Sequence, residues 1–179
     1  ADENIFFKSI QKSRTVIICS AFYERKNPML IHRLIEQSKD IDFILLGKNW
    51  ERYKSFNQLI ACKNLKYVDV PYSEYPQYYA KASVYLSLSS LEGGPIPLIE
   101  AMMSSLIPVV TNTGFAKDVI MDGKNGLIIE LSDLNINLIK NKIEKAFNME
   151  FDNRTYTINN YSWSTFSNVI FSSIEKLLK

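Results

Sequence analysis

The chain has 179 residues, of which 46% are hydrophobic and 22% are charged. This length suits a single folded domain, and the apolar share excludes an intrinsically disordered chain. With 21 basic and 19 acidic side chains the net charge is only +2, which is too balanced for a nucleic-acid-binding surface or a basic membrane anchor. We therefore expect no nucleic-acid partner.

No segment at the N-terminus resembles a signal peptide, and no apolar run approaches the ~20 residues of a transmembrane helix. The two cysteines, Cys19 and Cys62, form neither a CxxC pair nor a known zinc-binding pattern. We expect both to be reduced and mostly buried thiols of a cytosolic protein.

The first half of the chain alternates continuous apolar runs with polar or amphipathic segments. Continuous apolar runs are typical of strands that are buried on both faces of a parallel sheet. Asn27 and Pro28 supply the N-cap and the first position of the first helix. The predicted elements are strand Thr15–Ser20, helix Pro28–Lys39, strand Phe43–Gly47, helix Trp50–Cys62, strand Lys66–Val70, helix Ser73–Ala82 and strand Val84–Ser87.

The second half continues the alternation after a loop that is rich in glycine and proline. Phe151–Asn160 is polar and predicts an irregular segment. The predicted elements are helix Leu98–Ser105, strand Ile107–Thr111, helix Ala116–Met121, strand Gly126–Ile129, helix Asp133–Asn148 and helix Trp163–Leu178.

Strands that alternate with helices predict an α/β fold, with a doubly wound, Rossmann-like parallel sheet of about six strands. We expect the strand order 3-2-1-4-5-6, helices on both faces, and a single domain over residues 1–179. In such sheets ligands bind beyond the carboxyl ends of the strands, where the strand order reverses. The loops at that point are Ser20–Pro28 and Leu88–Pro97.

These two loops have complementary chemistry. Arg25 and Lys26 lie in the first loop, and Gly93 and Gly94 precede a predicted helix in the second. Backbone amides at a helix N-terminus and the helix dipole favour negative charge. The sequence therefore predicts a site for an anionic ligand such as a diphosphate.

Other motifs carry less information. His32 lies inside the first predicted helix, where a surface or half-buried histidine is more common than a catalytic one. Asp40 and Asp42 form a DxD, but they precede a strand and so belong to the wrong end of the sheet. A tyrosine cluster with partly helical spacing favours packing over sugar stacking; it consists of Tyr72, Tyr75, Tyr78 and Tyr79.

Three motifs follow one another in the second half. Glu92–Met102 reads EGGPIPLIEAM, with seven residues between Glu92 and Glu100; Ile107–Thr111 reads IPVVT; and Asp118–Ile128 reads DVIMDGKNGLI. This succession resembles the EGxGxPxxEAM, xPVV and EVIxDGxNGLL signatures of GT-B retaining glycosyltransferases of family 4, also called glycosyl transferases group 1. The matching part is the C-terminal, donor-binding domain, and the resemblance covers essentially the whole chain.

The resemblance implies a role for each matching residue. Lys26, with Arg25, would contact the diphosphate of a nucleotide-diphosphate sugar, and Glu100 would hydrogen-bond the ribose hydroxyls. Glu92 would lie beside the donor sugar as the catalytic carboxylate. The backbone amides that would contact the donor are those of Gly93, Gly94 and Ile96.

The implied function is the donor-binding half of a retaining, hexosyltransferase-type enzyme that transfers a sugar to a glycan or lipid-linked acceptor in polysaccharide biosynthesis. The resemblance implies no cofactor and no metal. The partners would be the nucleotide-sugar donor and an N-terminal acceptor domain outside this chain, so the isolated domain should be inactive. The expected location is the cytoplasm, with peripheral association at the inner membrane surface through the full-length enzyme.

Two departures from the signatures favour an alternative. Ala21 stands where the family often has an arginine, and Pro95 stands where it has the second glycine, so a charge and an amide donor are missing. The alternative is a non-catalytic Rossmann-like module that binds a nucleotide or a protein partner. A receiver-type domain would need an acidic cluster after the first strand, and Ser20-Ala21-Phe22 does not supply one.

Overall fold

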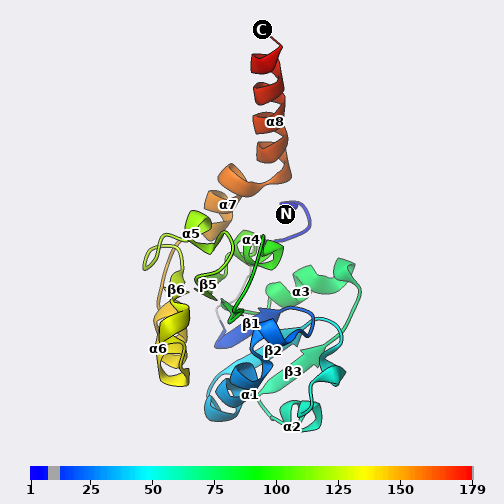
Figure 1. Ribbon diagram of the computed structural model, residues 1–179, viewed down its shortest axis with the longest axis vertical. Coiled ribbons are helices and arrows are strands. Elements are labelled where there is room, and N and C mark those ends of the chain that lie inside the picture. The colour runs from blue at the N-terminus through cyan, green and yellow to red at the C-terminus, as the bar shows by residue number, and fades with distance from the viewer. Residues whose placement is uncertain (8–12, 179) are drawn as a thin grey trace.

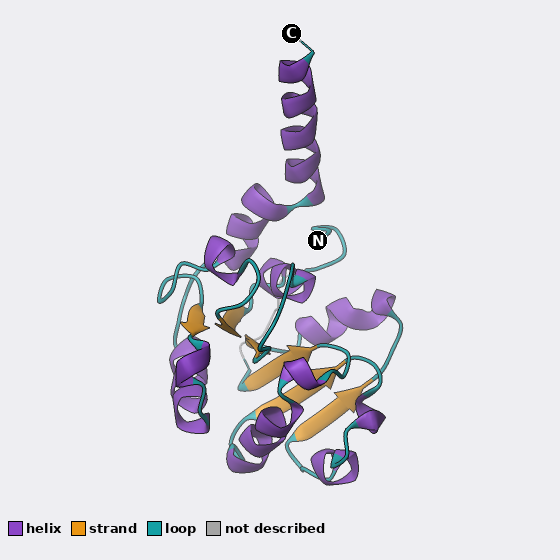
Figure 2. Ribbon diagram, in the orientation of Figure 1, coloured by secondary structure: helices purple, strands orange, loops and turns teal. Residues whose placement is uncertain are grey.

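The computed structural model describes residues 1–7 and 13–178. Its strands form one parallel sheet in the order β3-β2-β1-β4-β5-β6, which confirms the predicted fold class and strand order. The strands are β1 (Thr15–Cys19), β2 (Asp42–Leu46), β3 (Leu65–Val68), β4 (Val84–Ser87), β5 (Ile107–Thr111) and β6 (Leu127–Ile129). Figures 1 and 2 show the sheet at the centre of the domain with helices around it.

Successive strand residues point to opposite faces of the sheet, and each face has its own core. Val16 and Ile18 of β1 pack under one set of helices, whereas Ile17 and Cys19 pack under the other. The first face is covered by α1 (Pro28–Gln37), α2 (Phe56–Ile60) and α6 (Ile136–Phe147). The second face is covered by α3 (Tyr75–Tyr79), α4 (Ile96–Met103) and α5 (Ala116–Val119).

One predicted helix is broken. Trp50–Cys62 forms a 3-10 turn, η2 (Trp50–Arg52), and then the short helix α2, because the backbone at Tyr53 is extended (φ −69°, ψ 124°). Trp50 and Tyr53 are both buried, and both rings contact the ring of Phe22. The extended residue allows the rings of both Trp50 and Tyr53 to face the core. The burial of these two rings takes the place of a continuous run of helical hydrogen bonds.

The prediction that Phe151–Asn160 is irregular is wrong. Helix α7 covers Asn153–Tyr161, and the side chain of Asp152 accepts a hydrogen bond from Thr155 N–H at its start. The buried Asn153 side chain donates to the backbone oxygens of Leu106 and Asn125, both at 2.9 Å. Contacts with distant parts of the chain therefore hold a helix that has no strong apolar face of its own.

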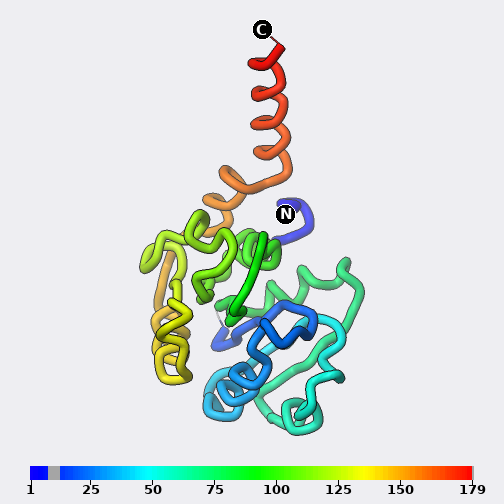
Figure 3. Tube along the Cα trace, viewed as in Figure 1, coloured from blue at the N-terminus to red at the C-terminus, as the bar shows by residue number. Residues whose placement is uncertain are grey.

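The N-terminal segment packs against α7 and the second core. Arg154 of α7 donates to the backbone oxygens of Phe6, Met103 and Glu3. The ring of Phe6 is fully buried against the rings of Tyr72 and Tyr79. In Figure 3 the start of the chain accordingly lies beside α4 and α7.

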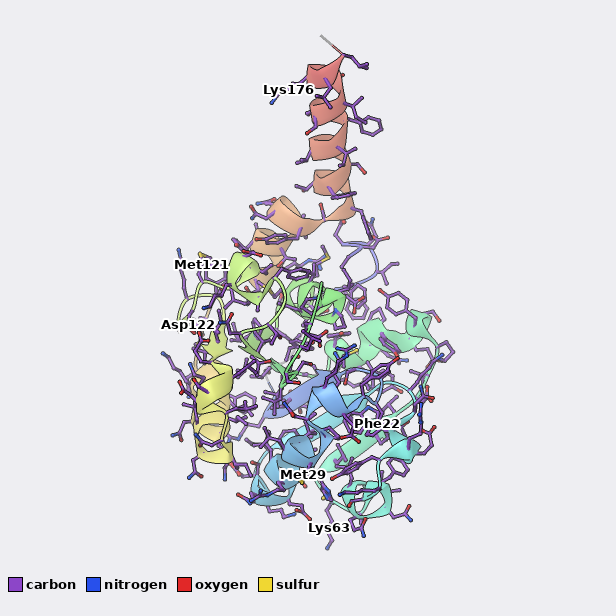
Figure 4. All side chains as sticks on the ribbon, in the orientation of Figure 1. Phe22, Met29, Lys63, Met121, Asp122 and Lys176 are labelled. Carbon is purple, nitrogen blue, oxygen red and sulfur yellow. The ribbon has the colours of Figure 1, made fainter. Side chains whose placement is uncertain are left out.

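The last helix, α8 (Trp163–Leu177), projects away from the rest of the domain, and its labelled residue Lys176 lies near the outer end (Figures 1 and 4). None of its residues is buried. Its exposed large apolar side chains are Trp163, Phe166, Val169, Ile170, Phe171, Ile174 and Leu177. Within the described part of the chain, no helix combines the length and apolar character needed to cross a membrane.

Candidate functional site

The loops that follow β1 and β4 lie side by side, as the strand order predicts, and are joined by hydrogen bonds. The first loop contains a 3-10 turn, η1 (Glu24–Lys26), and ends at Asn27 in a left-handed conformation (φ 55°). Asn27 occupies the N-cap position of α1, but its side chain does not cap the helix: Nδ2 donates to Leu88 O at 2.6 Å. Ser90 N–H donates to Arg25 O at 2.7 Å.

Three charged side chains meet across these loops. Lys26 Nζ donates to Glu92 Oε1, and Arg25 Nη1 donates to Glu92 Oε2 at 3.2 Å and to Leu91 O at 2.9 Å. Burial raises the pKa of Glu92, but hydrogen bonds from Lys26 and Ser89 and the charges of Lys26 and Arg25 outweigh it, so the pKa lies below its ordinary value. Two cations are therefore held beside one ionised carboxylate at the predicted place.

The glycine-bearing turn after Glu92 is supported from beneath by the loop that follows β5. Gly114 has a φ of +56°, and a Cβ on it would lie 2.3 Å from Gly93 O. Phe115 supports Gly94, because a Cβ at Gly94 would lie 3.0 Å from its ring. Ile96 N–H donates to Gly94 O at 2.8 Å, so in this conformation that amide is not directed at a ligand.

Helix α4 begins at Ile96, two residues before the predicted start, and contains few amides that a ligand could use. Pro95 and Pro97 have no N–H, and Leu98 N–H donates to Pro95 O at 3.0 Å. The usual contribution of a helix N-terminus to anion binding is thus reduced, and the side chains of Lys26 and Arg25 are the main source of positive charge.

Glu100 lies one turn further along α4 and is only 2% exposed. Tyr72 Oη donates to Oε1 at 2.5 Å, and Tyr79 Oη donates to Oε2 at 3.1 Å. Burial raises the pKa of Glu100 above its ordinary value; the two tyrosine hydrogen bonds and the charge of the N-terminal amine offset only part of this. Both carboxylate oxygens thus already accept a hydrogen bond, and little of Glu100 is open to a ribose in this conformation.

Cys19, at the end of β1, is a buried thiol whose pKa is influenced by both Lys26 and Glu100. Burial raises the pKa of this thiol to about 12, with Glu100 raising it further and Tyr79 and Lys26 lowering it. A small cavity of about 10 Å³ lies under the loop and includes Glu92, Pro95 and Leu98 in its lining, but neither Lys26 nor Glu100. Lys26, Arg25 and Glu92 thus form one cluster, and Glu100 belongs to a neighbouring one.

The hydrogen bonds from Tyr72 and Tyr79 to Glu100 were not predicted, because the spacing of the four tyrosines favoured packing. Tyr79 is fully buried in the core, as predicted, but Tyr72 is 54% exposed and its hydroxyl is bound to Glu100. Tyr72 opens a 3-10 turn, η3 (Tyr72–Glu74), that runs directly into α3. The position of this turn beyond β3, on the same edge as the other loops, was the one available indication.

The remaining candidates lie elsewhere. Asp42 begins β2 and Asp40 pairs with Arg14, which confirms that the DxD is a connector at the amino ends of the strands. Cys19 and Cys62 are both free and buried, as predicted. His32 lies in α1, as predicted, but only 7% of the residue is exposed, so the expectation of a surface or half-buried side chain is wrong. His32 also belongs to a group of side chains that could hold a metal, with Glu36 and Cys62.

Comparisons with known proteins agree with this architecture. The family described as glycosyl transferases group 1 matches residues 1–163. An uncharacterised glycosyltransferase, MJ1178 of Methanocaldococcus jannaschii, is 30% identical over 123 residues, which are 65% of this chain and 34% of that protein.

Solved structures share the fold over nearly the whole chain. Sucrose-phosphate synthase from Thermosynechococcus elongatus has a TM-score of 0.79 at 16% identity, over 99% of this chain and 51% of that one. Anabaena Alr3699/HepE, solved in complex with UDP and glucose, has a TM-score of 0.77 at 19% identity, over 98% of this chain and 55% of that one. The chain thus spans about half the length of these two proteins, and the family match over residues 1–163 shows that it belongs to the glycosyl transferases group 1 family.

Proposed function

We propose that this chain is the donor-binding domain of a retaining, family 4 glycosyltransferase and that it binds a nucleotide-diphosphate sugar between the loops after β1 and β4. The observation that carries the proposal is the pair of cations, Lys26 and Arg25, held against Glu92 where those loops meet. The complex of Alr3699/HepE with UDP and glucose supports a donor of this class.

The proposed binding step is an exchange of anions. A diphosphate would compete with the Glu92 carboxylate for Lys26 and Arg25, since both cations now neutralise that carboxylate. Charge-assisted hydrogen bonds to phosphate oxygens are strong, and Arg25 is exposed enough to turn toward a ligand. Glu92, once released, would face the donor sugar and orient it through its hydroxyl groups.

In the proposed transfer, the bond between the anomeric carbon and a diphosphate oxygen breaks on the face where the acceptor hydroxyl attacks, so the configuration is retained. The bonding electron pair goes to the diphosphate, and the acceptor proton passes to a phosphate oxygen. Lys26 and Arg25, once bound to the diphosphate, would stabilise the growing negative charge. No metal is needed in this scheme.

The activity of the whole enzyme would need an acceptor-binding domain outside this chain. The apolar face of α8 supports this, because exposed apolar surface of this extent is typical of an interface. We propose that α8 docks on that domain, that the acceptor is a glycan or a lipid-linked sugar, and that the enzyme acts in the cytoplasm, at the inner membrane surface when the acceptor is lipid-linked. The isolated domain would then bind donor without transferring it.

Calorimetric titration with UDP, GDP and ADP and their sugar conjugates, each with and without EDTA, tests the donor site. We expect one nucleotide to bind and EDTA to have no effect. Lys26→Ala should weaken that binding about 10–100-fold, because a hydrogen bond to a charged group contributes about 1.5–3 kcal/mol. Lys63→Ala is the matched control, since Lys63 (labelled in Figure 4) is exposed and precedes β3 at the opposite edge of the sheet.

Equal losses in Lys26→Ala and Lys63→Ala would refute a specific diphosphate site. Failure of every nucleotide to bind at millimolar concentration would instead favour the non-catalytic alternative. That alternative has one structural argument in its favour: the tyrosines occupy both oxygens of Glu100, the carboxylate that the family resemblance assigns to the ribose.

A further inference from the structure

A second cluster of potential ligands lies on the first face of the sheet, at the edge where the strands begin. His32 and Glu36 are four residues apart on α1, and Cys62 follows α2, three residues before β3. A ring nitrogen of His32, a carboxylate oxygen of Glu36 and Sγ of Cys62 all lie within 4.8 Å of one another. Residues four apart in a helix share one face, so α1 presents both of its side chains toward Cys62.

Burial gives this cluster a closed side and an open side. His32 and Cys62 are 7% and 8% exposed, whereas the side chain of Glu36 is 50% exposed. A cation could therefore enter from solvent beside Glu36 and reach the two buried ligands. Glu36 can also move toward the ion at little cost, because packing does not fix its outer atoms.

The hydrogen bonding of the His32 ring is consistent with a cation bound at Nε2. Nδ1 lies 3.3 Å from Tyr53 Oη, in hydrogen-bond contact, while Nε2 is buried and has no hydrogen-bond partner among the described residues. Nε2 lies 3.5 Å from Glu36 Oε1 without forming a hydrogen bond. If Nδ1 carries the proton and donates it to Tyr53, the lone pair of Nε2 faces a carboxylate oxygen, an arrangement that a cation between them would relieve.

We propose that His32 Nε2, a Glu36 carboxylate oxygen and Cys62 Sγ bind a zinc ion, with water as the fourth ligand. Nitrogen, oxygen and thiolate sulfur together suit Zn²⁺, whereas Mg²⁺ and Ca²⁺ require oxygen ligands. Tetrahedral bonds of ~2.0–2.3 Å place the ligand atoms about 3.3–3.6 Å apart. The atoms now lie within 4.8 Å of one another, so the cluster needs to contract by up to about 1.2–1.5 Å. Tyr53 would hold the His32 ring in the required tautomer and orientation.

The zinc ion would link α1 to the segment that connects α2 and β3. This place is remote from the donor site, because β2 and β3 begin here while Lys26 and Glu92 lie beyond the carboxyl ends of the strands. Zinc should therefore raise the stability of the domain without being needed for nucleotide binding. The ligand spacings of 4 and 26 residues match no common zinc motif, which is why the sequence does not reveal the site.

Zinc binding can be measured on the full chain after EDTA treatment and buffer exchange. We expect one Zn²⁺ per chain in competition with a chromophoric chelator. At about 100 times its Kd, zinc should raise the Tm by about 5–10 °C. The Co²⁺-substituted domain should show a thiolate-to-cobalt charge-transfer band, and Cys62→Ser should abolish it while the second cysteine, Cys19, remains in place.

The variant that decides the proposal is Glu36→Gln, because an exposed side chain can be changed without disturbing the core. We expect its zinc affinity to fall at least about 10-fold. Glu175→Gln, an equal loss of charge on the exposed helix α8, should bind zinc like the wild type. Failure of the wild type to bind zinc, or unchanged affinity in either Glu36→Gln or Cys62→Ser, would overturn the site.

Discussion

Replacing Glu100 by alanine is the sharpest test of the structure around α4. A solvent-facing ribose ligand could be removed without harm to the fold. Glu100, however, is buried, and its two oxygens accept hydrogen bonds from Tyr72 and Tyr79. We therefore expect Glu100→Ala to destabilise the domain whether or not a nucleotide is bound.

The two tyrosines should contribute unequally to that loss. Tyr72 is 54% exposed, so water can replace its lost partner, but Tyr79 is fully buried. Of its described partners, the hydroxyl of Tyr79 would keep the Cys19 thiol, which is a weak partner, and a long contact of 3.5 Å to Pro97 O. A buried hydroxyl that loses its strong acceptor costs about 1–3 kcal/mol. The space left by the side chain adds about 1 kcal/mol, so the free energy of unfolding should fall by about 2–4 kcal/mol.

Urea unfolding monitored by circular dichroism provides the assay. The midpoint of Glu100→Ala should fall with an unchanged m-value, and the Tm should drop by about 5–15 °C. Glu100→Gln keeps the volume and an acceptor oxygen, so it should stay within about 1 kcal/mol of the wild type. In a double-mutant cycle, Tyr79→Phe should cost much less in the Glu100→Ala background, with a coupling of about 1–2 kcal/mol.

Two results together would refute this reasoning. One is a wild-type urea midpoint for Glu100→Ala, and the other is strict additivity of Glu100→Ala and Tyr79→Phe. Both would mean that the carboxylate of Glu100 faces solvent and that the tyrosine hydroxyls do not depend on it. The assignment of a ribose role to Glu100 would then gain support.

Two further predictions concern the loop that carries Glu92. Gly114→Ala should lower the free energy of unfolding by about 1–3 kcal/mol and weaken nucleotide binding, since its Cβ would meet Gly93 O. Gly123→Ala is the control: Gly123 has a φ of +80° but open space around it, so this variant should lose stability without losing nucleotide binding. Urea midpoints and titrations of both variants check this, and equal binding losses would contradict it. The depressed pKa of Glu92 contributes stability that is present above pH 4.5 and is lost as the pH falls below it. Lys26→Met should raise the pKa of Glu92, so the urea midpoint of this variant should fall less between neutral and acid pH than that of the wild type. An unchanged dependence of the midpoint on pH would mean that Lys26 does not pair with Glu92.

The sheet and its loop pairing were predictable because they follow from local chemistry. Continuous apolar runs that alternate with amphipathic segments are typical of a parallel sheet with both faces covered. The strand order of such a sheet then brings the loops after β1 and β4 together. The loops that carry Arg25, Lys26 and Glu92 therefore meet as expected, and their side chains form ion pairs there. The roles of these residues in donor binding stay predictions.

The features that escaped prediction depend on contacts between distant segments. Helix α7 is held by the buried amide of Asn153, whose partners are 47 and 28 residues away. The environment of Glu100 is set by tyrosines from η3 and α3 and by Phe6 from the start of the chain. A pattern of residue types along the sequence records none of these pairings.

The outward position of α8 has a practical consequence for work on this domain in isolation. Its apolar side chains stand in water along fifteen residues, a length of about 22 Å. Two such helices can shield each other, so we expect sedimentation and light scattering to report self-association that grows with protein concentration. Shortening the chain after Ser162 would remove this tendency, and it would leave the two cores of the sheet untouched.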